Sequence, residues 1–376
     1  MNKSEKWEKL LLEINQTYKD KHQVISTEIK GLDYILGGGL ELGSKVQIVA
    51  ESSTGKSTIA LQMAKNFCQK NLNVLYVDTE NSITKELLES TGCNEYLNEG
   101  KKDGMLVLLK ESDFDTVNEK LDVLIKSGVF KLIIIDSLAS MVSNNYVETK
   151  DGKEKIIPLT NNNTNYESRP LNLFINKYSN LANKYNVAII YINQFRNKVD
   201  PKNGTILKEF GNKIVRYNSD IIIRIKKEKD GIWQDENGII STDKEFNRNK
   251  LPTHSKLIMT LDKSNKMLCG TTTDGYLKYG YGIDELFDRT LDRIRNNEIQ
   301  KNGKYYSLPN ESTNFNGLID LINHIVSSSK TSTLSPDNIM KLEGGYLHLD
   351  FVDDEDEGLY DENGKLDVEF ISEDEE

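Results

Sequence analysis

Residues that can bind a nucleoside triphosphate lie between a short apolar run and a helical pattern, in segment 46–58. The loop ends in Gly-Lys-Ser, at the offset of a Walker A motif. Its candidate phosphate-binding residues are Ala50, Glu51, Ser52, Ser53, Thr54, Gly55, Lys56, Ser57 and Thr58. In such a loop the backbone N–H groups meet the phosphates, the lysine reaches the β and γ oxygens, and the serine hydroxyl holds Mg²⁺. The segment therefore predicts binding of ATP and Mg²⁺.

One position departs from the motif, because Ala50 stands where the pattern has its first glycine. A methyl group is the smallest possible intrusion, and Gly55, Lys56 and Ser57 supply most of the ligand contacts. The alternative is an accidental Gly-Lys-Ser in a surface turn. The strand, loop and helix order around the motif favours the phosphate-binding interpretation.

Three further side chains follow predicted strands and complete a candidate hydrolytic site. Asp136 comes after four apolar residues, as expected of a Walker B aspartate that helps to hold Mg²⁺. Glu80 lies two residues beyond the strand ending at Asp78 and can polarise the attacking water. Gln194 is a neutral amide that can sense the γ-phosphate without competing for the metal. A strand-end carboxylate and a helix-start charge are the alternatives for Asp136 and Glu80.

The elements that must position these residues are apolar runs at 73–78, 105–109, 132–136 and 187–192, separated by helical patterns. Near-continuous apolar strands alternating with helices predict an α/β fold with a mainly parallel sheet between helices. Ligands of such sheets bind beyond the carboxyl ends of the strands, which is where the candidate residues lie. Residues around Thr27 are expected to start a helix, and Gly37, Gly38 and Gly39 to form a turn.

Composition narrows the class of protein. The chain has 376 residues, of which 37% are hydrophobic and 28% charged. It has neither an apolar run long enough to span a bilayer nor a signal-like start, so we expect no membrane association and a cytoplasmic location, in a bacterium or a phage-infected bacterium. Three cysteines without paired spacing, Cys68, Cys93 and Cys269, fit a reducing compartment and make a zinc site unexpected.

The charge is uneven along the chain. Residues 350–376 hold fourteen Asp and Glu against Lys365 alone, a charge of −13. Since the whole chain carries −11, residues 1–349 carry +2. Such a body can bind a polyanion, and the acidic tail can compete for the same surface. The alternative is that the tail only keeps the protein in solution.

A basic segment follows Gln194. Segment 196–213 has five basic residues against Asp200 and Glu209, and glycines for flexibility. This composition suits a segment that becomes ordered on single-stranded DNA by binding its phosphates. The candidate DNA-binding residues are Arg196, Lys198, Lys202, Lys208, Gly211, Asn212 and Lys213. A second long loop, residues 143–170, is also rich in Lys and Asn, and an ordinary solvated loop is the alternative for both.

The order of these motifs resembles the RecA family of DNA strand-exchange proteins over residues 24–308. Asp78-Thr79-Glu80 resembles the family segment with the catalytic glutamate, Ile135-Asp136-Ser137 its Walker B Asp-Ser, and Ile192-Asn193-Gln194 the root of its second DNA-binding loop. Segment 25–43, Phe210-Gly211-Asn212-Lys213 and Tyr281-Gly282-Ile283 also match. The segment Ser82-Ile83-Thr84 is similar to the corresponding segment of UvsX-type phage recombinases.

The resemblance implies an ATP-dependent recombinase that forms a helical homo-oligomer on single-stranded DNA and pairs it with homologous double-stranded DNA, with single-strand-binding and loader proteins as further partners. It also implies that Lys263 and Lys266 reach the ATP of a neighbouring protomer, although they are three residues apart where the family has two. Thr84 and Leu87 replace the family's residues beside adenine, which leaves base selectivity open.

The expected organisation is an N-terminal helix (1–22) that packs on its own core or a neighbouring protomer, a RecA-like ATPase core (23–285), a small C-terminal region (286–346) and the acidic tail (347–376). Two alternatives remain. One is a hexameric helicase or another ATPase of the same fold. The other is a DNA-coating or mediator protein that binds ATP without useful turnover.

Overall fold

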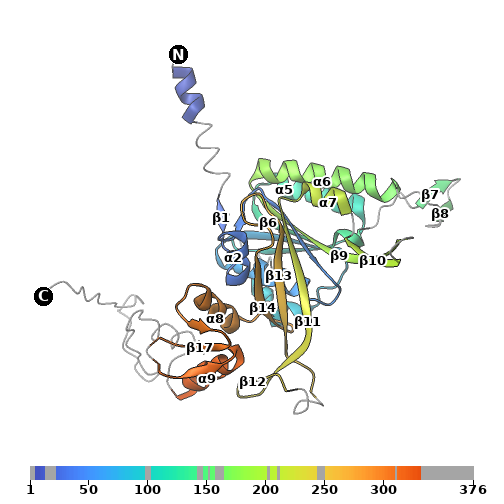
Figure 1. Ribbon diagram of the computed structural model, residues 1–376. Coiled ribbons are helices and arrows are strands. Elements are labelled where there is room, and N and C mark those ends of the chain that lie inside the picture. Colours follow the sequence, from blue (N-terminus) through green and yellow to red (C-terminus); the bar gives the residue numbers. More distant parts are fainter. Residues whose placement is uncertain are drawn as a thin grey trace, which may run out of the picture.

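The structure is a computed structural model (Figure 1). It describes residues 5–12, 23–97, 103–141, 147–150, 153–156, 165–200, 204–209, 212–243, 250–309 and 311–331. Residues 5–12 form a helix whose apolar side chains Trp7, Leu10, Leu11 and Leu12 are exposed. None of the helices that the structure describes has the length and apolar character needed to cross a bilayer.

An 11-stranded sheet forms the centre of the molecule, in the order β15-β14-β13-β11-β3-β9-β6-β4-β5 with β10 beside β9 and β12 beside β11. Its strands are β3 (Lys45–Ala50), β4 (Asn73–Asp78), β5 (Leu106–Lys110), β6 (Phe130–Asp136), β9 (Ala188–Asp200), β10 (Gly204–Glu209), β11 (Ile221–Gln234), β12 (Ile240–Ser241), β13 (His254–Lys263), β14 (Thr272–Lys278) and β15 (Gly282–Ile283). From β11 through β3, β9, β6 and β4 to β5 all pairs are parallel. The predicted α/β fold with a mainly parallel sheet is confirmed.

Helices cover both faces of this sheet because its strands are apolar on both sides. In β4, Val74 and Tyr76 pack with the first group of helices, whereas Leu75 and Val77 pack with the second. The first group is α2 (Lys30–Leu36), α3 (Lys56–Gln69) and α4 (Lys85–Thr91), followed by the 3-10 helix η1 (Cys93–Tyr96). The second is α5 (Phe114–Lys126), α6 (Asn165–Tyr185) and α7 (Asn212–Asn218), which lie together in Figure 1.

Beyond the parallel part, β13, β14 and β15 extend the sheet in antiparallel fashion. They lead into α8 (Glu285–Arg295), a three-stranded sheet of β16 (Gln300–Asn302), β17 (Tyr305–Ser307) and β18 (Asn314–Asn316), and α9 (Leu318–Thr331). This small region has its own apolar cluster and a second one shared with the large sheet, in which the rings of Tyr276 and Phe287 stack at 4.1 Å. The C-terminal region is therefore anchored on β14.

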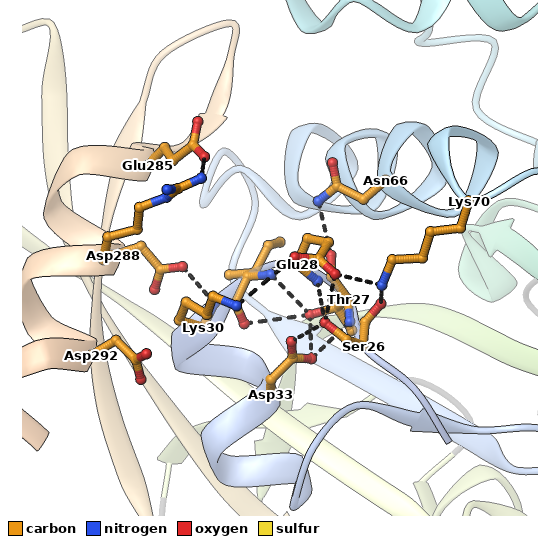
Figure 2. Close-up of polar contacts among 12 residues, drawn as sticks. Ser26, Thr27, Glu28, Lys30, Asp33, Asn66, Lys70, Glu285, Asp288 and Asp292 are labelled. Atoms are coloured by element: carbon orange, nitrogen blue, oxygen red, sulfur yellow. Dashed lines mark hydrogen bonds and ion pairs between the residues drawn. The ribbon is translucent and has the colours of Figure 1, made fainter. Parts of the chain in front are cut away.

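The segment before β3 begins differently from the expectation, because α2 starts at Lys30 and not near Thr27. The hydroxyls of Ser26 and Thr27 and the Thr27 N–H donate to the Asp33 carboxylate instead. The first N–H groups of α2, those of Lys30 and Gly31, donate to the carboxylate of Asp288 from α8 (Figure 2). A residue far along the chain thus caps this helix, and no local pattern marks such a cap.

The turn after α2 needs its glycines. Gly37, Gly38 and Gly39 all have positive φ. A Cβ on Gly39 would lie 2.2 Å from the carbonyl oxygen of Ile25, so no side chain fits there. This turn lets β1 (Val24–Ile25) pair with β2 (Leu40–Glu41) and brings the chain to β3.

Candidate nucleotide and DNA site

The loop predicted to bind phosphate joins β3 to α3, in the strand, loop and helix order that the motif requires. Gly55 precedes α3 in the left-handed region, and a Cβ there would lie 2.4 Å from Cδ2 of Leu277. The ammonium group of Lys56 folds back over the loop and donates to the carbonyl oxygens of Glu51 (2.7 Å) and Ala50 (3.3 Å). Ala50 is buried with its neighbours in β3, so its methyl group is accommodated in the core.

Parallel register brings the remaining predicted residues to the same edge of the sheet. Ala50 at the end of β3 pairs with Gln194 in β9, and Asp78 at the end of β4 pairs with Asp136 at the end of β6. Because β9 lies between β3 and β6, the ends of β3, β6 and β4 and the Gln194 position of β9 lie at one edge of the sheet. This edge is where ligands of such sheets bind.

Asp136 is 2% exposed and is held by a tyrosine hydroxyl. Tyr76 donates to its Oδ2 at 2.7 Å. Burial raises the pKa of Asp136, which hydrogen bonds from Ser57 and Tyr76 oppose. Burial likewise lowers the pKa of Lys56, while the negative charges of Asp136 and Glu80 act in the opposite direction. The charges of Asp136 and Glu80 therefore act on the protonation of Lys56.

The donor set fits Mg²⁺. The Ser57 hydroxyl lies close enough to the Asp136 carboxylate to lower its pKa, and both groups offer the oxygen ligands that this ion prefers. No cluster of three or more His, Cys, Asp or Glu with metal-binding geometry occurs among the described residues. Such a sparse set suits an ion that keeps waters and takes phosphate oxygens as its other ligands.

Glu80 is held by three donors that all contact the same carboxylate oxygen, Oε1. They are Ser137 Oγ at 2.6 Å, Gln194 Nε2 at 2.7 Å and Ser140 Oγ at 2.9 Å. The backbone around Glu80 is fixed separately, since Thr79 Oγ1 donates to the carbonyl oxygen of Ser137 at 2.7 Å. The structure thus brings Glu80 and Gln194, predicted from distant segments, into direct contact.

The two lysines expected to reach a neighbour's ATP are engaged within the chain. Lys263 Nζ donates to the carbonyl oxygens of Ser219 (2.6 Å), Arg216 (2.9 Å) and Tyr217 (3.2 Å), at the end of α7. Lys266 Nζ lies 2.7 Å from a carboxylate oxygen of Glu41. Their role toward a neighbouring protomer stays a prediction.

The described part of the basic segment forms two paired strands and not an open loop. β9 continues past Gln194 to Asp200 and pairs with β10, with Arg196 opposite Lys208 and Lys198 opposite Ile206. Asn212 and Lys213 open α7. Lys202 and Gly211 lie outside the described residues.

Within the other long loop, β7 (Val147–Lys150) pairs with β8 (Lys153–Ile156), and α6 begins at Asn165. Thus part of the expected loop is helical. Whether either segment contacts DNA stays a prediction.

Sequence reasoning missed three contributors to the site. Tyr76 lies inside an apolar run and reads as core, although its hydroxyl binds Asp136. Ser137 enters the sequence prediction only as part of the Walker B motif. Ser140, at the end of the 3-10 helix η2 (Leu138–Ser140), has no part in that prediction. A hydroxyl spaced three residues from Ser137, one helical turn on, is the only local signal that could have pointed to Ser140.

Comparison with known proteins adds the family. The RecA N-terminal domain family matches residues 5–258. The RecA protein of Phytoplasma mali is 26% identical over 309 residues, which cover 80% of this chain and 81% of that protein. The RecA protein of Laribacter hongkongensis is 28% identical over 222 residues, 58% of this chain and 57% of that protein. That of Streptomyces rimosus is 25% identical over 225 residues, 59% of this chain and 56% of that protein.

The chain therefore spans about four fifths of the first of these relatives and rather more than half of the other two. Among solved structures, the crystal structure of the RadB recombinase aligns with a TM-score of 0.46 and 21% identity, over 69% of this chain and 97% of that one.

Proposed function

Because the chain belongs to the RecA N-terminal domain family, we propose that it is an ATP-dependent recombinase of DNA recombination and repair. In this proposal it assembles as a helical filament on single-stranded DNA, hydrolyses ATP to ADP and phosphate, and promotes pairing and strand exchange with homologous double-stranded DNA. Single-strand-binding and loader proteins would be its further partners. The sequence of residues 82–84 supports a more specific similarity to UvsX-type phage recombinases.

The convergence of Lys56, Asp136, Glu80 and Gln194 at one edge of the sheet is the observation that carries the proposal. Lys56 would bind the β and γ oxygens of ATP through its ammonium group. Ser57 and Asp136 would hold Mg²⁺, which neutralises charge on the phosphates. Glu80 would accept a hydrogen bond from the attacking water through Oε2 and so orient it toward the γ-phosphate.

Coupling to DNA follows from the course of β9. Gln194 touches the catalytic carboxylate, and six residues later the same strand reaches the turn of the β9–β10 hairpin at Asp200. A contact between Gln194 and the γ-phosphate would therefore bias the conformation of the basic segment. Binding of ATP and affinity for single-stranded DNA are then linked through one strand.

Replacing Glu80 by Gln tests the hydrolytic step. We expect Glu80→Gln to lower kcat for ATP at least about 100-fold, because the amide cannot accept a proton or polarise water as a carboxylate does. Binding of a fluorescent ATP analogue should be unchanged. The matched control is Glu89→Gln on α4, where the carboxylate is exposed beside Lys85. An unchanged kcat in Glu80→Gln would remove Glu80 from the mechanism and revive the DNA-coating alternative.

Assembly is tested by electron microscopy on circular single-stranded DNA, with a slowly hydrolysed ATP analogue and with no nucleotide. We expect continuous helical filaments that require the analogue. Closed rings would instead support the hexameric helicase alternative. Bare DNA under both conditions would contradict the role given to the basic segment.

A further inference from the structure

The serine at the end of η2 has a contact that no motif assigns. Ser140 Oγ lies 2.9 Å from Glu80 Oε1, the oxygen that also receives Ser137 Oγ and Gln194 Nε2. Ser140 Oγ also lies 3.0 Å from Ser137 Oγ. The three donors come from two neighbouring strands of the sheet, since Ser137 and Ser140 follow β6 and Gln194 lies in β9.

The number of hydroxyl protons decides which of the serine contacts are hydrogen bonds to Glu80. Each serine hydroxyl has one proton to donate, so both protons are used when both serines bind Glu80. The contact between the serines then only keeps them adjacent. Oε1 accepts from three neighbours, whereas no hydrogen bond to Oε2 is found among the described residues. Saturating one oxygen fixes the plane of the carboxylate and leaves the other directed at a reactant.

The backbone makes Ser140 a stable anchor. Ser137 directly precedes η2, and its N–H donates to Thr79 Oγ1 at 2.8 Å. The Ser140 N–H donates to the Ser137 carbonyl oxygen at 3.2 Å. Leu138 between them is 1% exposed and packs with the helices of the α5 face. The Ser140 hydroxyl is therefore held toward Glu80 by a short, packed turn.

We propose that Ser140 is a positioning residue for ATP hydrolysis, which orients the Glu80 carboxylate together with Gln194. The inference rests on the proposed function, because it assigns to Glu80 the attacking water. It adds that the chain just before residues 143–170 has its own direct contact with the catalytic group. Glu80 is then bound by Ser140, which precedes residues 143–170, and by Gln194, which precedes residues 196–213.

The test compares Ser140→Ala, Ser140→Cys and Ser140→Thr with the wild-type protein, in steady-state ATP hydrolysis with single-stranded DNA. We expect kcat to fall about tenfold in the Ala and Cys variants. Alanine removes the hydrogen-bond donor, and cysteine is similar in size to serine but its thiol is a weak donor. KM for ATP should stay within about twofold, since ground-state binding does not involve Ser140. Ser140→Thr retains a hydroxyl and should stay within about threefold of the wild-type kcat.

Ser327→Ala on α9 is the matched control, because among the described residues that hydroxyl binds the carbonyl oxygen of Asn323 in its own helix. A wild-type kcat in Ser140→Ala would overturn the inference. So would equal losses in the Ala and Thr variants, or a rise in KM that accounts for the loss. If Ser140→Ala fails to bind an ATP analogue, Ser140→Cys and Ser140→Thr are compared instead, because their side chains differ mainly in donor strength. Equal kcat values in these two variants would then overturn the inference.

A double variant tests the shared oxygen. If Ser140 and Gln194 hold one carboxylate, removing both should cost little more than removing one, so Ser140→Ala with Gln194→Ala should stay within about threefold of the slower single variant. Losses that multiply would overturn the shared arrangement. Absence of hydrolysis in the wild-type protein itself would instead refute the proposed function, and the inference with it.

Discussion

The ammonium group of Lys263 shows how one residue can satisfy a helix end. Its three acceptors are the carbonyl oxygens of Arg216, Tyr217 and Ser219, in and just after the last turn of α7. Such carbonyls have no partner within the helix, and a cation also complements the negative end of its dipole. Burial lowers the pKa of Lys263, and the nearby Asp220 carboxylate opposes that shift. Lys263 therefore ties β13 to α7, the helix that follows the basic hairpin.

This cap predicts a stability effect that Lys266 should not share. Lys263→Met keeps most of the side-chain stem but removes the donors, and we expect it to lower the free energy of unfolding by about 1–3 kcal/mol. Lys266→Met is the control, because its ion pair with Glu41 leaves the lysine side chain 57% exposed. Exposed pairs contribute about 0–1 kcal/mol. Urea denaturation of the isolated protein measures both, and equal midpoints would contradict the capping role.

Among the elements, α2 depends on a carboxylate from the C-terminal region. Asp288 on α8 is 4% exposed and accepts from the N–H groups of Lys30 (2.5 Å) and Gly31 (2.9 Å). Figure 2 shows its carboxylate beside Lys30. Burial raises the pKa of Asp288 to about 6, although those two N–H groups and Arg295 act to lower it. The contact joins α2, near the start of the chain, to α8 in the C-terminal region.

The raised pKa makes folding stability depend on pH. The pKa of Asp288 is about 6 in the folded protein and about 4 in the unfolded chain. The folded protein therefore binds the Asp288 proton more tightly than the unfolded chain does. Stability from this group is therefore present below about pH 4 and is lost as the pH rises through about 6. Relative to Asp288→Asn, which does not titrate, the wild-type protein should gain about 2 kcal/mol between pH 7.5 and pH 4.5. Urea denaturation of both proteins at the two pH values measures this, and a constant difference would contradict it.

For the whole molecule, the separation of charge along the chain predicts an effect on DNA binding. Residues 350–376, which lie outside the described residues, carry −13 against +2 for the rest. We expect a chain that ends at Leu349 to bind single-stranded DNA more tightly at low salt, with the advantage shrinking as salt screens the tail. Fluorescence anisotropy over a salt series measures this. Equal affinities at every salt concentration would leave the solvation alternative.

Local spacing determined part of this protein from sequence alone. The offset of Gly55, Lys56 and Ser57 and the position of Asp136 and Glu80 after apolar runs could be found, because a phosphate loop and a strand end are set by neighbouring residues. The same apolar runs predicted a parallel sheet covered on both faces, since burial on both sides removes polar alternation.

Only the tertiary structure decided which of these residues meet. Strand order places β9 between β3 and β6, so that Gln194 reaches Glu80, and the turn after β6 brings Ser140 to the same oxygen. The start of α2 was predicted wrongly because its cap, Asp288, comes from a distant helix. Hydrophobic periodicity specifies which face of an element is buried but carries no information on which element covers it. Contacts across strands and between distant helices depend on that choice, and so they emerge only when the chain is folded.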